Sequence, residues 1–151
     1  MRLNILHEAM RKCLDNRCTC SKYFHICVAF RGKHILSIGK NCVCKTNTKF
    51  AFKDSLHAEL DAISKIRDKK PFDILVIRTD CTGKKLLISK PCILCSNWIN
   101  LGIYPIRKIY YSDGKGIVAT NKMALIVPTQ YLCTKSPLNF KSSFIIGNTR
   151  T

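Results

Sequence analysis

The stretch DSLHAELDAISKIRDKKPFDILVIRT, residues 54–79, contains a helix signal followed directly by a buried-strand signal. The apolar residues of the helix recur at the spacing of one face: Leu60, Ile63 and Ile66. Asp54 or Ser55 can cap this helix, and basic residues gather toward its carboxyl end before Pro71 stops it. DILVIRT (73–79) is a continuous apolar run, which is typical of a strand buried on both faces. The stretch therefore predicts a sheet with helices packed on it.

The elements on either side of this stretch complete an α/β order. Before it, residues 3–14 have the apolar spacing of a helix, and residues 23–30 and 33–39 are predicted as strands joined at Arg31-Gly32. Beyond it we expect three elements: a strand or strand extension at 85–89, a helix from Pro91 to about Leu101 that Gly102 closes, and a strand at 107–112. The order predicts a three-layer α/β/α sandwich with a mixed sheet of about five strands.

One domain, residues 1–151, accounts for the whole chain, because no internal repeat, low-complexity tract or linker divides it. Residues 41–53 are expected to form a loop. Residues 123–127 are predicted as a short strand or a helix, and residues 130–151 are expected to be loosely organised.

The chain is strongly basic, with 26 basic and 9 acidic residues and a formal net charge of +17. The bases concentrate in residues 1–53 and 81–151, whereas residues 54–80 are close to neutral. Such a field favours polyanionic or phosphorylated ligands. The equally weighted alternative is a composition that only keeps the protein soluble, since eighteen of the bases are lysines. No apolar run approaches the roughly 18 residues that span a membrane.

Charged residues interrupt the amino-terminal segment MRLNILHEAMRKC, so it is not a secretory signal, and we expect an intracellular protein in a reducing compartment. A disulfide scaffold is then not expected, and most cysteines are predicted to be small buried side chains. The ten cysteines are Cys13, Cys18, Cys20, Cys27, Cys42, Cys44, Cys81, Cys92, Cys95 and Cys133.

One pair of cysteines has a strong local context. Cys92 and Cys95 stand three residues apart at the predicted start of a helix, so their sulfurs can converge on one point. His57 stands near the same end of the helix in the opening stretch, and the buried strand between them allows the two helices to lie side by side. One nitrogen and two sulfurs suit tetrahedral zinc with a fourth position open to water. Glu59 can accept and pass on a proton of that water.

These residues spell H-x-E as His57-Ala58-Glu59 and P-C-x-x-C as Pro91-Cys92-Ile93-Leu94-Cys95, the signature of zinc nucleobase deaminases. The chain resembles the cytidine/deoxycytidylate deaminase superfamily. HAELDAI (57–63) is similar to the family's HAE helix, and KPCILCSNWINLGIYPIRKIYYSDG (90–114) to its PCxxC helix, GI turn and following strand. The resemblance covers about residues 23–116. It implies a cytidine-deaminase-like fold and a single zinc-dependent deaminase domain.

The resemblance also implies the roles of the site residues. His57, Cys92 and Cys95 would hold one catalytic Zn²⁺ per chain, and Glu59 would carry protons in a hydrolytic deamination. Asn41, with Asn47 as the second candidate, would contact the base or sugar, and Ala58 would contact the substrate. The alternative for either asparagine is a loop residue that satisfies its own backbone.

The substrate class is narrowed by His57, because a histidine at this position resembles the deoxycytidylate, tRNA-adenosine and polynucleotide-editing branches more than the free-cytidine branch. A short single domain favours conversion of cytosine to uracil in a nucleotide such as dCMP or CMP. The alternative is a nucleic-acid-editing cytidine or tRNA-adenosine deaminase, which the net charge of +17 supports. Four aromatic residues that lie near basic residues in the sequence also support it: Trp98, Tyr104, Tyr110 and Tyr111. Core packing is the default role for three of them, Trp98, Tyr110 and Tyr111. A second alternative is a non-catalytic binding module with a deaminase-like fold.

A second, structural zinc is the weaker expectation for the remaining cysteines. Its ligands would be Cys13, Cys18, Cys20 and His25, or would include Cys42 and Cys44. Homo-oligomers are common in the superfamily, but no self-complementary face is visible in the sequence. No membrane partner is expected.

Overall fold

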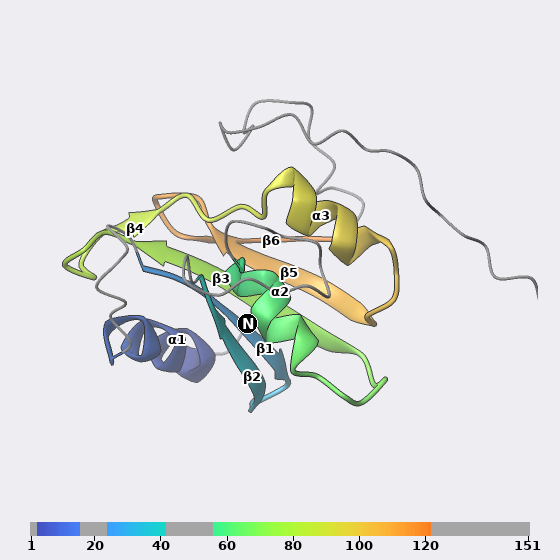
Figure 1. Cartoon of the computed structure of the whole chain (residues 1–151). Helices are drawn as coiled ribbons and strands as arrows, with labels where there is room; N and C mark the ends of the chain where they lie inside the picture. The colour runs from blue at the N-terminus through green and yellow to red at the C-terminus, as the bar shows by residue number, and fades with distance from the viewer. Residues whose placement is uncertain (1–2, 16–23, 42–55, 122–151) are drawn as a thin grey trace, which may run out of the picture.

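The computed structural model describes residues 3–15, 24–41 and 56–121 (Figure 1). Nine elements follow one another along these residues: α1 (Leu3–Asp15), β1 (Phe24–Arg31), β2 (His34–Lys40), α2 (Ala58–Ser64), β3 (Phe72–Thr79), β4 (Leu86–Leu87), α3 (Ile93–Asn100), β5 (Ile106–Ser112) and β6 (Ile117–Thr120). Among these residues, no helix is long and apolar enough to cross a membrane.

The strands form one mixed sheet in the order β2-β1-β3-β5-β6, and the short β4 pairs with β3 outside this path. β3 and β5 run parallel, and the other pairs are antiparallel. The parallel pair requires a crossover connection, which α3 provides. The predicted α/β class with a mixed sheet is confirmed. The sheet has six strands instead of about five, because β6 carries no clear strand pattern and was not predicted.

Both faces of the sheet are covered, which confirms the three layers. On one face, Ile26, Val28, Leu75 and Ile77 pack with Ile5 and Ala9 of α1. On the other face, the alternate strand residues pack against α2 and α3: Cys27, Ala29, Ile74 and Val76 meet Ala58, Ala62, Ile63 and Ile99. Figure 1 shows α1 apart from the two other helices. Successive residues of a strand point to opposite faces of the sheet, so one set contacts α1 and the other set contacts α2 and α3.

The second helix is shorter than predicted at both ends. α2 begins at Ala58 with His57 at the N-cap, so neither Asp54 nor Ser55 caps it; both lie outside the described residues. It ends at Ser64 instead of running to Pro71. The Nζ of Lys65 donates to the carbonyl oxygen of Ile38 at 2.7 Å, which ties the helix end to β2. Ile66 packs against the core from beyond the helix end, so the apolar spacing continues past Ser64 and does not mark where the helix stops.

One further detail differs from the sequence prediction. Pro91 precedes the N-cap Cys92 and is not the first helical residue, whereas Gly102 follows α3 at φ 75°, as predicted for a closing glycine. Tyr110 packs in the α1 layer and Tyr111 in the α2 layer, in agreement with core packing as their default role. Residues 42–53, 123–127 and 130–151 lie outside the described residues.

Candidate metal centre

The N-termini of α2 and α3 carry the predicted metal ligands. His57 and Cys92 occupy the N-cap positions of the two helices, both with extended backbone, at φ −73° and φ −67°. The His57 side chain makes no capping hydrogen bond to α2, which departs from the usual use of an N-cap side chain, and the Cys92 sulfur interacts with Cys95 of α3. Cys95 lies one turn further along α3 and is fully buried. The side chains at the two helix starts are thus available to one another.

The structure brings the three predicted ligands together. The Nδ1 of His57 lies 3.4 Å from the Sγ of Cys92 and 3.3 Å from the Sγ of Cys95. The three ligand atoms all lie within 4.8 Å of one another. Zinc bonds of about 2.0–2.3 Å in a tetrahedron separate nitrogen from sulfur by about 3.6 Å. The cluster therefore fits a zinc ion in both geometry and donor atoms, and three protein ligands leave a fourth position open.

Hydrogen bonds within the cluster stabilise the thiolate form of Cys92. A hydrogen bond from the Cys95 thiol, assisted by His57, lowers the pKa of Cys92 to about 4 despite burial. The same hydrogen bond and burial raise the pKa of Cys95 well above its usual value. The hydrogen bond with Cys92 raises the pKa of His57. The cluster without metal is thus a thiolate beside a thiol and a readily protonated imidazole, and metal binding must release protons.

Glu59 lies beside this cluster and is 1% exposed. Burial raises the pKa of Cys27 well above its usual value, and the negative charge of Glu59 adds to this effect. The same charge contributes to the raised pKa values of His57 and Cys95. The Oε2 of Glu59 has no hydrogen-bond partner among the described residues. A buried carboxylate oxygen without a partner costs free energy, which a ligand in the open position would offset.

An apolar wall supports the cluster. Leu56 and Leu60 pack with Cys95, and Cys92 and Trp98 pack against them. Trp98 therefore lies in the wall, in agreement with core packing as its default role. This wall keeps bulk water from one side of the candidate site, which strengthens charge interactions within it.

The two predicted substrate contacts lie at the start of α2 and the end of β2. Ala58 is fully buried in the first turn of α2. Asn41 directly follows β2, and its N–H donates to the carbonyl oxygen of His25 at 3.0 Å. The N–H of Lys40 donates to Asp61 Oδ2 at 2.9 Å, so α2 and the end of β2 are joined next to Asn41. Asn47 lies outside the described residues.

Two residues near the site were not assigned to it from the sequence, where His25 was named only as a candidate ligand of a second zinc. His25 lies on β1, and its Nε2 is buried without a hydrogen-bond partner among the described residues. Burial lowers its pKa, while the charge of Glu59 acts in the opposite direction. Asp61 holds the end of β2 as described above. The available signals were a histidine among apolar residues in YFHICVAF and an acid two positions after Glu59.

Two solved structures are similar to this chain. The apo form of dCMP deaminase from the cyanophage S-TIM5 has 21% sequence identity and a TM-score of 0.48, over 75% of this chain and 86% of that chain. The same enzyme in complex with dCMP and dUMP has 19% identity and a TM-score of 0.46, over 74% of this chain and 82% of that chain. No protein-family model matches the chain, and no curated protein matches it. What this chain does therefore has to be inferred from its own side chains.

Proposed function

We propose that the chain is a zinc-dependent hydrolase that deaminates a nucleobase, and that the base is the cytosine of a nucleotide of the dCMP or CMP type. The observation that carries the proposal is the buried Glu59 carboxylate beside the His57, Cys92 and Cys95 cluster, whose Oε2 has no hydrogen-bond partner among the described residues. A structural zinc site is closed by four ligands and needs no carboxylate next to it. A proton carrier beside three ligands and an open position suits hydrolysis.

Zinc, when bound, would supply a water molecule whose pKa is lowered toward neutrality. His57, Cys92 and Cys95 are the residues that would hold it. Glu59 would take one proton from the attacking water and pass it to the ring nitrogen next to the carbon that bears the exocyclic amine. Glu59 would then take the second proton of that water from the hydroxyl group now on the ring carbon and give it to the leaving amine. Water and cytosine thus yield uracil and ammonia, and Glu59 returns to its initial state.

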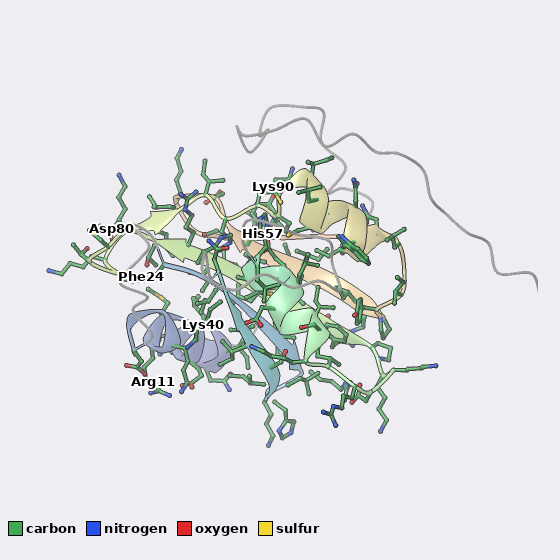
Figure 2. All side chains as sticks on the ribbon, in the orientation of Figure 1. Arg11, Phe24, Lys40, His57, Asp80 and Lys90 are labelled. Atoms are coloured by element: carbon green, nitrogen blue, oxygen red, sulfur yellow. The ribbon has the colours of Figure 1, made fainter. Side chains whose placement is uncertain are left out.

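The substrate side of the proposal rests on charge and on position. Lys90 lies two residues before Cys92, and Lys40 directly precedes Asn41, so two bases flank the proposed site (Figure 2). A phosphate group would be attracted to these two lysines, and Asn41 would contact the nucleobase or the sugar. The role of Asn41 extends the family resemblance to this chain, and the attraction of the phosphate rests on charge.

An ammonia-release assay on the purified zinc-loaded protein tests the proposal. The substrates are cytidine, CMP, dCMP, adenosine and short single-stranded DNA and RNA. Release from dCMP or CMP that exceeds release from cytidine supports the nucleotide assignment. Absence of release from every substrate contradicts the proposal and favours a non-catalytic binding module.

The rival function is editing of a base in a polynucleotide, which the net charge of +17 favours. Deamination of oligonucleotides in the same assay, without activity on dCMP or CMP, would establish the rival. Oligonucleotide binding that disappears at modest salt, without deamination, would show only non-specific attraction.

A further inference from the structure

The parallel strands β3 and β5 separate at their carboxyl ends. Their pairing runs from Phe72 and Ile106 to Val76 and Tyr111 and then stops. Beyond this point β4 pairs with the last two residues of β3. The segment after β4 crosses to the β5 side, where Ile88 bridges Asp113 and the Ser89 N–H donates to the Ser112 carbonyl oxygen at 2.8 Å. The returning segment 86–89 therefore fills a fork between the two strands.

Two buried hydroxyl groups close this fork. Ser89 is 2% exposed and Ser112 is fully buried. The Oγ of Ser89 donates to the carbonyl oxygen of Val76 at 2.7 Å and accepts a hydrogen bond from the Ser112 N–H at 2.8 Å. The Oγ of Ser112 lies 2.5 Å from the carbonyl oxygen of Leu87 and 2.7 Å from the Oγ of Ser89. The hydroxyls thus join β3, β4 and β5 where the direct pairing of β3 and β5 has ended.

The fork leads directly to the metal centre. Ser89 stands three residues before Cys92, and the chain runs from β4 to α3 through buried Pro91 (Figure 1). The ring of Pro91 fixes its φ angle, and its carbonyl oxygen accepts a hydrogen bond from Ser96 Oγ at 3.2 Å. Few torsions are therefore free between Ser89 and Cys92, so a shift at the fork passes to the Cys92 sulfur.

We propose that the Ser89–Ser112 hydroxyl pair positions Cys92 relative to His57 and Cys95 and so sets the zinc affinity of the cluster. The proposal rests on the metal centre of the proposed function, but not on the identity of the substrate. Neither serine is a metal ligand; both are positioning residues that act through the backbone of residues 89–92. Groups that orient metal ligands from outside commonly change metal affinity by 10- to 100-fold when they are removed, as an order of magnitude.

The test measures zinc affinity on the full chain. Apo-protein is titrated with zinc against a chromophoric chelator for the wild type, Ser89→Ala, Ser112→Ala and the control Ser64→Ala. Ser64 Oγ bonds to the carbonyl oxygen of Asp61 within α2, far along the chain from the fork, so its loss removes a hydrogen bond without touching the Cys92 segment. Both fork variants should bind zinc about 10- to 100-fold more weakly, and Ser64→Ala should bind it as the wild type does.

Four further measurements separate positioning from loss of stability. Thermal unfolding of each apo-protein fixes a temperature at which all variants are folded, and all titrations are made there. The visible spectrum of the cobalt-loaded protein should change in the fork variants, because it reports the geometry around the ligands. The double variant should lose less affinity than the sum of the single losses, since the two hydroxyls bond to each other. Ser89→Thr, which keeps a hydroxyl, should restore most of the affinity.

Unchanged zinc affinity and an unchanged cobalt spectrum in either folded fork variant would overturn the proposal, even if that variant is less stable. A similar affinity loss in Ser64→Ala would overturn it too, because the effect would then be general. A wild-type chain that binds no zinc would overturn both this inference and the proposed function. Normal zinc binding without deaminase activity would refute the proposed function alone.

Discussion

Replacing Gly39 by alanine would place a methyl group between β2 and the first turns of α2. An ideal Cβ on Gly39 would lie 2.9 Å from Ala62 Cα and nearer still to Ala58 O and Ala62 N. Ordinary contacts between carbon atoms are about 3.5–4.0 Å, so the helix would have to move away by about 1 Å or more. These three atoms all belong to the backbone, so no side chain can rotate to relieve the clash with them.

This displacement acts on both stability and the site. Overpacking of a well-packed region costs about 1–3 kcal/mol, and two bonds from β2 to α2 would also be strained. These are the bonds from Ser37 Oγ to Ala62 O at 2.7 Å and from Lys40 N–H to Asp61. Because α2 carries Glu59, a shift of about 1 Å would lower kcat/KM by about a hundredfold.

The assay is urea unfolding together with deaminase kinetics, with Gly116→Ala as the matched control. A Cβ on Gly116 would meet no atom within 4 Å, so the control should change stability by less than about 0.5 kcal/mol. Equal stability and activity of Gly39→Ala and Gly116→Ala would refute the close approach of β2 and α2.

Three other predictions concern the cluster and the contacts of α2. In the metal-free protein, iodoacetamide at pH 6 should label Cys92 before Cys95 and Cys27, because the pKa of Cys92 is lowered to about 4 and the pKa values of the other two are raised. Mass spectrometry of the peptides gives the order of labelling, and preferential labelling of Cys95 would contradict the prediction. Zinc affinity should fall as the pH falls, since the raised pKa of His57 makes its proton compete with zinc, and a pH-independent affinity would contradict the ligand assignment. Asp61→Ala should raise the KM for the nucleotide more than Asp61→Asn does, because the amide oxygen of asparagine can still accept the hydrogen bond from the Lys40 N–H. Equal effects of the two variants on KM would refute a positioning role for that hydrogen bond.

The three residues of the candidate metal centre could be predicted from the sequence because two of them lie where helices begin. His57 and Cys92 stand at helix starts, and a helix start is determined largely by a few neighbouring residues. The continuous apolar run of β3 then identified the strand that lies between the two helices. The fold class follows from the same order of elements, since a strand, a crossover helix and a parallel strand allow few arrangements.

The parts that could not be predicted depend on contacts between distant residues. α2 ends at Ser64 although Ile66 beyond it still packs against the core, so the spacing of apolar residues does not mark the helix end. The fork between β3 and β5 is likewise invisible in the sequence, since Ser89 and Ser112 look like ordinary polar strand residues. The close approach at Gly39 is a third case, because a glycine near a strand end has several common explanations.

The most direct test of the account is Glu59→Gln, measured for zinc content and deaminase turnover in the same preparation. Glutamine has nearly the same shape as glutamate but cannot carry the protons of hydrolysis, and Glu59 is not one of the three ligands. We expect one zinc per chain in both proteins and a loss of kcat of about a hundredfold or more in the variant. Near-normal turnover of Glu59→Gln, with zinc still bound, would contradict the role of Glu59.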